Sequence, residues 1–252
     1  MKQVLEALRR EGLPEPNYYR ELIAQTTELL RAEDSRLRPR DSKGRPGGLI
    51  RLPELSTIVV PDLHARMWFL LHVLASPLRG MSVAEHLSKG ELQIVCVGDG
   101  FHAEARAAER WKEAFKEFSG KFKRHRAMDE EMRESLGLME MVMQLKLLFP
   151  DHFHFLKGNH ENILNEEGRG NHPFRKFAYE GEMVKEWVLR FYGEEFLYSF
   201  GDFEHELPLV AADSSFMISH AEPQRFYSPE ELLNFREEEE VVLGLTWTAN
   251  DG

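Results

Sequence analysis

Hydrophobic residues near the start of the chain recur at the spacing of an α-helix. They are Val4, Leu5 and Leu8, and then Leu22, Ile23, Leu29 and Leu30. Side chains three and four positions apart lie on one face of a helix, whereas the glycine and prolines of "GLPEPN" (12–17) interrupt one. The pattern therefore predicts two helices within residues 2–31. The segment that follows, 31–48, is rich in charge, glycine and proline, which is typical of a linker or an exposed loop with a solvated basic cluster.

From residue 57 onward, short runs of β-branched and aromatic residues replace the helical spacing. The runs are "TIVV" (57–60), "QIVCV" (93–97), "HFHFL" (152–156), "PLVAA" (208–212) and "SFMIS" (215–219). Such runs are typical of short strands, and long helical patterns separate the first three. Strands that alternate with helices indicate an α/β fold.

Two later stretches carry an apolar face at helical spacing, and we expect both to be helices. They are residues 128–149, where several methionines fill the apolar face, and residues 182–200. The acidic run "REEEEVV" (236–242) is typical of a solvated helix end. We expect residues 1–50 to form an N-terminal helical segment with a basic linker, and residues 51–252 to form one main domain.

The chain is acidic overall. Its 43 Asp and Glu residues against 32 Lys and Arg residues give a formal net charge of −11. This balance argues against a general nucleic-acid or membrane-surface binder, so we expect neither partner. An acidic protein that acts on anions needs a local positive centre, which directs attention to individual residues.

The cysteine content and the lengths of the hydrophobic runs indicate in which cellular compartment the protein is expected. Cys96 is the only cysteine, so no intrachain disulfide can form, and its apolar surroundings predict a buried thiol in a reducing compartment. The N-terminus is charged throughout, and no stretch approaches the roughly 18 apolar residues of a membrane span. We therefore expect a cytoplasmic protein with no membrane segment.

Polar residues of one chemical kind follow four of the predicted strands. They are Asp62 and His64 after the first, Asp99 after the second, Asn159 and His160 after the third, and His220 after "SFMIS". In open α/β sheets, sites form beyond the carboxyl ends of the strands, where loops converge. Each residue is a weak signal alone, but chance is a poor explanation for finding all of them in this order after four strands.

These residue types suit a pair of divalent metal ions about 3.5–4 Å apart, which need a shared carboxylate and further oxygen and imidazole ligands. Asp99 can bridge the two ions with its two oxygens. Asp62 and His64 can complete one ion, and Asn159 and His220 the other. Nitrogen and oxygen ligands without thiolate favour Mn, Fe or Zn. Glycines before Asp99 and Asn159 permit sharp turns.

The residue next to one of these ligands has a different predicted role. His160 adjoins Asn159 but points elsewhere by its neighbouring position, so it can serve as a general acid to a leaving group.

The ordered motifs resemble those of the calcineurin-like metallophosphoesterases, and most closely the phosphoprotein phosphatase family of Ser/Thr phosphatases. That family carries Gly-Asp-x-His, Gly-Asp-x-Val-Asp-Arg-Gly, Gly-Asn-His-Glu and His-Gly-Gly blocks in this order. The corresponding segments here are "PDLHAR", "GDGFHAE", "GNHEN" and "SHAEP", and "LTWTAND" resembles the family's Trp-Ser-Asp-Pro region. The resemblance covers about residues 57 to 251.

The resemblance implies a two-sheet β-sandwich flanked by helices, a dinuclear metal centre, and hydrolysis of a phosphate monoester by a metal-bound hydroxide. It places Asp62, His64, Asp99, Asn159 and His220 on metal-ligand positions, and His160 on the general acid. The substrate it implies is a phosphorylated protein, and the catalytic domain is residues 51–252.

The chain departs from the family at the residues that hold the phosphate. His102 stands where the family has the Asp that orients the catalytic histidine, and Ala103 stands where it has a phosphate-binding Arg. Arg106 is a possible substitute. Lys157 keeps the positive charge of the Arg before Gly-Asn-His-Glu but loses its bidentate fork. We therefore take Arg106, Lys157 and His102 as the candidate substrate-binding residues.

Two further departures concern the metal ligands and the end of the domain. Ala221 and Glu222 follow His220 where the family has two glycines, and the family's last histidine ligand lies beyond Gly252. Either the natural chain continues and the domain here lacks its C-terminal part, or His102 or another histidine compensates, or the second metal binds weakly.

These departures leave two alternatives to a protein phosphatase. One keeps the metal centre but takes a dinucleoside polyphosphate or another small phosphoester as substrate. The other is a degenerate phosphatase-like protein that binds phosphorylated ligands or a partner without turnover.

Overall fold

The computed structural model describes residues 1–248 as a mixed α/β fold with two three-stranded sheets. In the first sheet, β5 (Leu92–Cys96) lies between β2 (Ser56–Val60) and β6 (Phe153–Phe155), and all three strands are parallel. Val60 pairs with Cys96, and Cys96 pairs with Phe155. The three strands therefore end level, and the loops that follow them begin at one edge.

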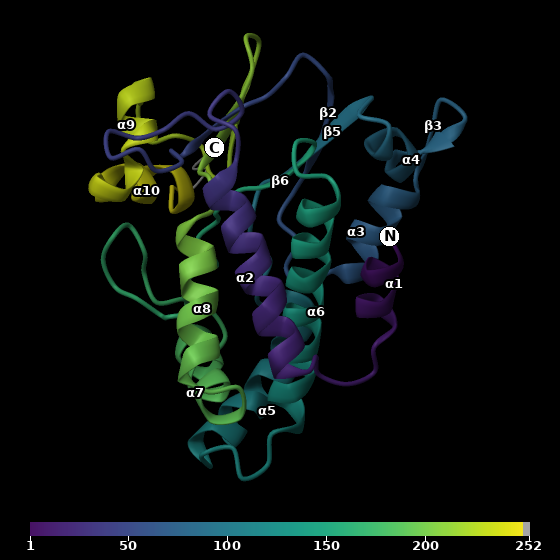
Figure 1. The fold of residues 1–252 in the computed structure, drawn as a ribbon. Helices are drawn as coiled ribbons and strands as arrows, with labels where there is room; N and C mark the ends of the chain where they lie inside the picture. The colour runs from purple at the N-terminus through teal and green to yellow at the C-terminus, as the bar shows by residue number, and fades with distance from the viewer. Residues whose placement is uncertain (249–252) are drawn as a thin grey trace.

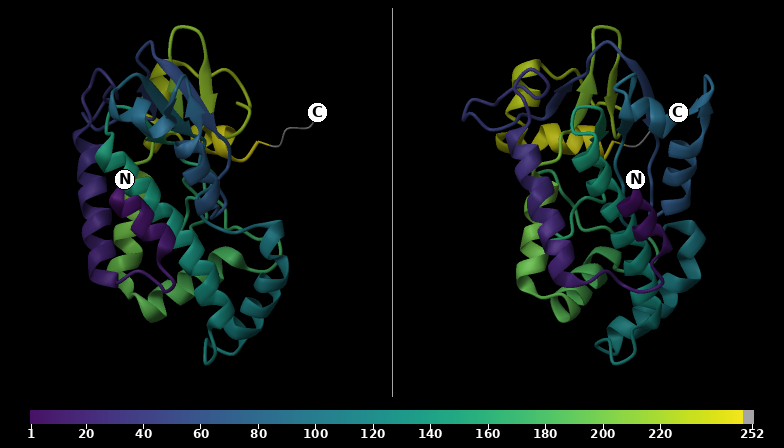
Figure 2. Two further views of the ribbon diagram at one scale, coloured as in Figure 1. Left: turned by 90° about the vertical axis from the view of Figure 1, so that its right-hand side faces the viewer. Right: turned by 45° about the vertical axis from the view of Figure 1, so that its right-hand side comes forward.

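The second sheet combines strands from opposite ends of the chain. Its order is β1 (Leu49–Arg51), β7 (Val210–Ala212) and β8 (Met217–Ser219), with β1 parallel to β7 and β7 antiparallel to β8. Both sheets contribute to one apolar cluster of Ile50, Leu52, Val95, Leu156 and Ala211. Figure 2 shows the strands gathered at one end of the molecule and the long helices at the other.

The long helices form a layer beside the sheets (Figure 1). α2 (Pro16–Ala32) packs on α6 (Arg126–Leu148) and α8 (Glu194–His205), and α1 (Lys2–Arg9) packs on α6. The Tyr19 hydroxyl donates to Leu136 O over 2.8 Å, and Arg10 forms an ion pair with the buried Glu140. The N-terminal helices thus share the main apolar core with α6.

The remaining elements are short. They are α3 (Met67–Ala75), the hairpin β3 (Pro77–Leu78) and β4 (Met81–Ser82), α4 (Val83–Ser88), η1 (Ala105–Ala107), α5 (Ala108–Ser119), α7 (Glu180–Phe191), α9 (Pro229–Leu233), η2 (Phe235–Glu237) and α10 (Glu239–Thr246). None of the helices in residues 1–248 is both long enough and apolar enough to cross a membrane.

Most of the elements expected from the hydrophobic pattern are confirmed. The five predicted strands and the helix over 128–149 are present, and residues 2–31 form two helices. The prediction of one continuous helix over 182–200 was wrong. The segment forms two helices, α7 and α8, and the helical conformation is interrupted at Gly193, whose φ is +88°. The apolar stripe continues across this break, so periodicity alone does not reveal it.

The basic segment after α2 is less exposed than its composition indicates. The Arg38 side chain is fully buried, and it donates to Gly47 O (2.7 Å), Glu206 O (2.6 Å) and the Glu33 carboxylate (3.1 Å). A buried guanidinium with all these acceptors fixes the path of a segment that lacks regular structure.

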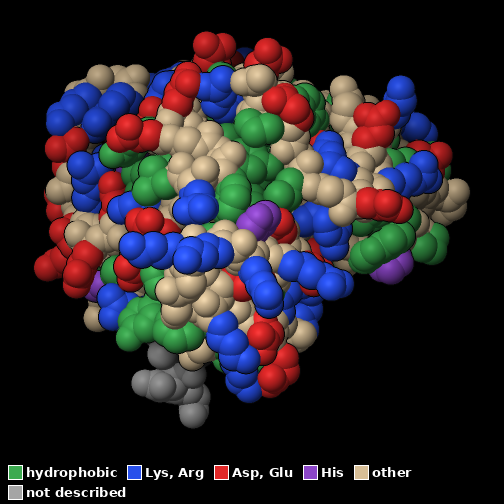
Figure 3. Space-filling model, turned by 90° about the horizontal axis from the view of Figure 1, so that it is seen from below, with side chains coloured by type: hydrophobic (Ala, Val, Ile, Leu, Met, Phe, Trp, Pro, Cys, Tyr) green, Lys and Arg blue, Asp and Glu red, His purple; other side chains and the backbone are tan. Residues whose placement is uncertain are grey.

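Lys and Arg side chains gather around the middle of the face seen in Figure 3. Lys121, Lys123 and Arg124 in the turn between α5 and α6, and Arg126 at the start of α6, are exposed, and the buried Phe122 anchors the turn.

Candidate metal centre

Loops meet beyond the level ends of β2 and β5. His64 N donates to Asp99 O (2.6 Å) and Ala65 N donates to Gly100 O (2.9 Å), so backbone hydrogen bonds join the two loops. His64, Ala65 and Asp99 have φ values of +41°, +57° and +53°. Residues other than glycine adopt this region only at a cost. The pairing between the loops therefore holds a shape that their side chains disfavour.

The buried carboxylate of Glu161 ties the loop after β5 to the loop after β6. It accepts hydrogen bonds from the backbone N–H groups of Asp99 (2.9 Å), Gly100 (2.7 Å) and Gly158 (2.7 Å). Our sequence reasoning gave Glu161 no role. The signal was available, because Glu161 is the last residue of the Gly-Asn-His-Glu motif.

The glycines Gly98 and Gly158 allow the same two loops to touch. A Cβ on Gly158 would lie 2.3 Å from Asp99 Oδ1, and one on Gly98 would lie 2.6 Å from Gly158 N. Gly98 also has a φ of +109°, which matches the sharp turn expected there. Gly158 is required for space rather than for its φ.

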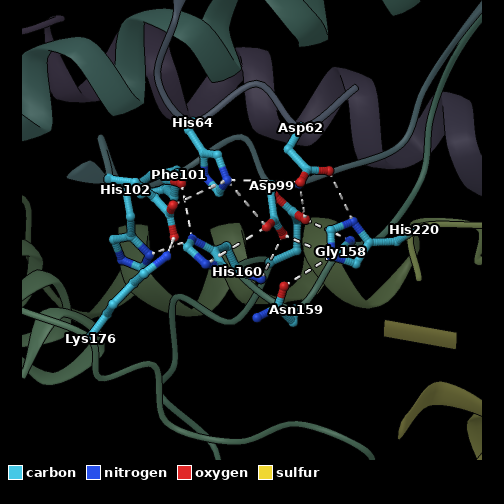
Figure 4. Close-up of polar contacts among 12 residues, drawn as sticks. Asp62, His64, Asp99, Phe101, His102, Gly158, Asn159, His160, Lys176 and His220 are labelled. Atoms are coloured by element: carbon cyan, nitrogen blue, oxygen red, sulfur yellow. Dashed lines mark hydrogen bonds and ion pairs between the residues drawn. The ribbon is translucent and has the colours of Figure 1, made fainter. Parts of the chain in front are cut away.

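The side chains that leave these loops form two groups around Asp99 (Figure 4). His64, Asp99 and His160 form the first, and Asp62, Asp99 and His220 form the second; within each group every residue offers a ligand atom within 4.8 Å of the others. Asp99 Oδ2 lies 3.8 Å from His64 Nε2 and 3.7 Å from His160 Nε2, while Oδ1 lies 3.6 Å from His220 Nε2. One carboxylate thus faces both groups.

His220 and Asn159 lie together in the second group. Because Val97 O can only accept, His220 Nδ1 must donate to it (2.9 Å), which makes Nε2 an acceptor. The Asn159 amide lies 3.0 Å from this Nε2. With its nitrogen turned inward, the amide also donates to both Asp99 oxygens over 3.2 Å. A hydrogen bond to the remote nitrogen is what orients a metal-binding imidazole.

His160 lies among the candidate ligands, and His102 lies behind it. His160 Nδ1 is 3.2 Å from Phe101 O and 3.0 Å from His102 Nδ1, while its Nε2 faces Asp99. Burial, and after it the neighbouring imidazoles, lowers the pKa of His160 well below its usual range, and burial lowers the pKa of His102 to about 3. Both rings are therefore neutral near pH 7.

Electrostatics favour a cation between the two groups. Burial and then the nearby charge of Glu161 raise the pKa of Asp99 well above its usual range. Bound cations reverse this effect, because they stabilise the carboxylate and need neutral imidazoles. A buried carboxylate shared by two groups that contain imidazole is a donor set that could hold metal ions.

The predicted substrate-binding cations have partners outside the two groups. Arg106 forms an ion pair with Glu134 (2.8 Å) and donates to His64 O (3.3 Å) and Ala65 O (3.1 Å), so it supports the His64 loop. Lys157 is buried and donates to Glu161 O. Burial lowers the pKa of Lys157.

Lys157 and His102 lie in different surroundings. Lys157 lines a cavity of about 360 Å³ together with Arg169, His205 and Arg236. His102 is buried against His160, Phe174 and Trp111.

Two charged residues beside the first group were not anticipated from the sequence. Glu104 Oε2 lies 4.0 Å from His64 Nε2, and Glu104 Oε1 lies 2.6 Å from Lys176 Nζ. Glu104 ends the "GDGFHAE" segment and could have been noticed there. Lys176 belongs to a loop without a recognisable motif.

The fourth block is tied to the C-terminal helix. Ala221 N donates to Leu245 O (2.9 Å), and Gln224 N donates to Gly244 O (3.0 Å). Of the segment "LTWTAND", Trp247 lies edge-on to the His172 ring at 5.1 Å, whereas residues 249–251 lie outside the described residues.

Comparison with known proteins leaves the family open. No family model and no curated protein matches the chain. Among solved structures, the chain is similar to a protein serine/threonine phosphatase from Saccharomyces cerevisiae described as similar to human phosphatase PP5, with 15% sequence identity and a TM-score of 0.48. The match covers 95% of this chain and 56% of that one, so the chain spans about half the length of its neighbour. A likeness of this size assigns no activity.

Proposed function

We propose that this chain is a metal-dependent phosphoesterase that hydrolyses phosphate monoesters, most similar to the Ser/Thr protein phosphatases. The observation that carries the proposal is the position of Asp99, whose carboxylate is shared by two groups of three candidate ligands. The proposed fold is a two-sheet sandwich flanked by helices, packed through the cluster of Ile50, Val95 and Ala211. Its catalytic domain is residues 51–252, after an N-terminal segment of residues 1–50.

The proposed centre takes two divalent ions, of which Mn, Fe and Zn suit the donor set. Asp62, His64, Asp99, Asn159 and His220 would hold them, with Asn159 using its amide oxygen and therefore the opposite amide orientation. The ions would supply positive charge to the phosphoryl oxygens and would lower the pKa of a bound water toward neutral pH. Three residues, Asp99, Gly100 and Gly158, keep this geometry through their hydrogen bonds to Glu161.

His160 is the proposed proton donor to the leaving group. With Nδ1 donating to Phe101 O, its Nε2 carries a lone pair and cannot act as an acid. A neutral imidazole is too weak an acid, so His160 would donate as the imidazolium, with its Nδ1–H shared between Phe101 O and His102 Nδ1 and the transferred proton on Nε2. His102 is therefore the residue that we propose to set the protonation of His160.

The substrate is a phosphorylated protein or a small phosphoester. The small-phosphoester alternative, such as a dinucleoside polyphosphate, is favoured by the ion pair of Arg106 with Glu134. Because this guanidinium is engaged behind the His64 loop, it is not a phosphate clamp in this arrangement. The lone buried Cys96 suits the proposed cytoplasmic location.

The test measures metal content and hydrolysis together. Purified protein loaded with Mn²⁺ should retain two ions by mass spectrometry and should hydrolyse p-nitrophenyl phosphate. His160→Ala should abolish turnover while the protein stays folded, whereas His72→Ala, at an exposed histidine of α3, should leave turnover unchanged. Failure to take up metal would refute the proposal, and metal uptake without turnover of any phosphoester would favour a non-catalytic binding protein.

A further inference from the structure

A loop before α7 places an aromatic ring and an ammonium group beside the histidines of the centre. The Phe174 ring centroid lies 3.8 Å from that of His160, and the Phe174 ring stacks on His102 at 5.0 Å with an interplanar angle of 11°. Two residues further on, Lys176 reaches Glu104 with an Nζ to Oε1 distance of 2.6 Å. Figure 4 shows Lys176 extending past His102 toward this corner of the site.

The buried residue Glu180 fixes the backbone of this loop. Its carboxylate accepts hydrogen bonds from the backbone N–H groups of Lys176 (3.0 Å), Phe177 (2.5 Å) and Ala178 (3.1 Å). Glu180 is fully buried, and it lies in the first turn of α7, where the helix dipole favours negative charge. Lys176 is therefore presented from a fixed point rather than from a free loop.

The charge around the candidate ligands is strongly negative. Asp62, Asp99 and Glu104 all lie within 4.0 Å of His64 Nε2. A phosphate monoester is itself an anion, so a cation beside the metal ions would strengthen its binding. Arg106 and Lys157 hydrogen-bond to Glu134 and to Glu161 O instead.

We infer that Lys176 is the phosphate-binding cation of this site, with Glu104 as the residue that positions it. This inference rests on the proposed function. The Glu104 carboxylate lies between the Lys176 ammonium and the His64 imidazole. Its Oε1 is 2.6 Å from Lys176 Nζ, and its Oε2 is 4.0 Å from His64 Nε2. An ammonium carries three N–H donors, and Glu104 takes one of them. The Lys176 side chain is 48% exposed, so the other donors are accessible to a ligand.

The test measures phosphate binding, so that it does not depend on turnover. Inorganic phosphate is titrated calorimetrically into Mn²⁺-loaded protein, for the wild type and for Lys176→Met. Loss of a hydrogen bond to a charged group predicts a phosphate Kd weaker by at least about tenfold. Lys176→Arg, which keeps the charge, should recover most of the affinity. Metal content and thermal midpoint should stay at the wild-type values in both variants.

A neighbouring residue gives the matched control. Arg175→Met removes the same charge one position away, but its guanidinium lies over the Tyr179 ring at 5.3 Å, and the phosphate Kd should stay within about twofold. Arg66 is the rival cation, because its guanidinium donates to Asp62 O over 3.4 Å. Loss of phosphate binding in Arg66→Met but not in Lys176→Met would overturn the inference.

Two further outcomes separate this inference from the proposed function. If the wild type binds Mn²⁺ and phosphate but hydrolyses no phosphoester, the proposed function fails, and the comparison of Lys176→Met with Arg175→Met still decides the role of Lys176. If the wild type turns over substrate, Lys176→Met should raise KM by about the same factor as the phosphate Kd. Equal phosphate affinity in wild type and Lys176→Met overturns the inference whatever the activity.

Discussion

Glu161→Gln is the substitution that most directly tests how the two central loops are held. The wild-type carboxylate accepts from three backbone N–H groups, and Glu161 is 1% exposed. Glutamine keeps one oxygen acceptor and replaces the other with an NH₂ group that faces the same donors. At least one of the N–H groups of Asp99, Gly100 and Gly158 is then buried without an acceptor.

The magnitude follows from two opposing contributions. Hydrogen bonds to a charged acceptor are worth about 1.5–3 kcal/mol each, and a buried unpaired donor costs about 1–3 kcal/mol. Removing the Glu161 charge also relieves its repulsion with Asp99, because Glu161 is the second cause of the raised Asp99 pKa. This relief offsets part of the lost hydrogen bonding. We expect a net loss of about 2–4 kcal/mol in the free energy of unfolding.

The assay is urea unfolding of metal-free protein in EDTA, followed by tryptophan fluorescence and circular dichroism. Glu167→Gln is the control, because Glu167 is exposed in the following loop and the same chemical change should cost less than about 0.5 kcal/mol. A loss below about 0.5 kcal/mol in Glu161→Gln as well would show that these hydrogen bonds do not hold the loops, and would refute the reasoning.

Three further predictions use other parts of the structure. Asp99→Asn should abolish retention of both metal ions by mass spectrometry because the carboxylate faces both groups, whereas His220→Ala should leave one ion bound. Arg10→Met should lower the free energy of unfolding by about 2–4 kcal/mol, since the Glu140 side chain is 1% exposed and would keep only the Tyr18 hydroxyl (3.0 Å) and lose its cationic partner; Arg10→Met/Glu140→Gln should recover part of this loss. Burial raises the pKa of the Cys96 thiol, so Ellman's reagent should react at pH 8 only after unfolding. The folded protein holds that thiol proton more tightly, so the stabilisation is complete below about pH 8.5 and is lost as the pH rises toward the folded pKa.

Local patterns were enough to predict the strands and the residues that follow them. Each strand was visible as a short β-branched or aromatic run, and the polar residues stood immediately after it in the sequence. Parallel pairing of Val60 with Cys96 and of Cys96 with Phe155 then brings Asp62, Asp99 and Asn159 to one edge. These side chains converge because of the register between the strands, which the hydrophobic pattern does not specify directly.

The directions of individual side chains could not be predicted in this way. Arg106 and Lys157 have suitable charges at suitable positions, but Glu134 and the Glu161 carbonyl determine where their cations lie. Lys176 comes from a loop without a motif, and it reaches the site only because Glu180 caps that loop. Such placements depend on partners far away in the sequence, so periodicity and composition carry no signal for them.

The backbone conformation of the centre opposes the stability of the fold. Asp99 and His102 have φ values of +53° and +65°, as unfavourable for non-glycine residues as those of His64 and Ala65. Left-handed backbone costs roughly 1–2 kcal/mol per residue, so four such positions oppose folding by about 4–8 kcal/mol. Glu161 and the backbone pairing between the loops offset this cost. Positive φ alone does not mark a site, because Arg79 and Lys121 adopt it in turns elsewhere. Here it coincides with candidate ligands and with the Glu161 hydrogen bonds, and this coincidence favours a binding or catalytic centre over a structural turn.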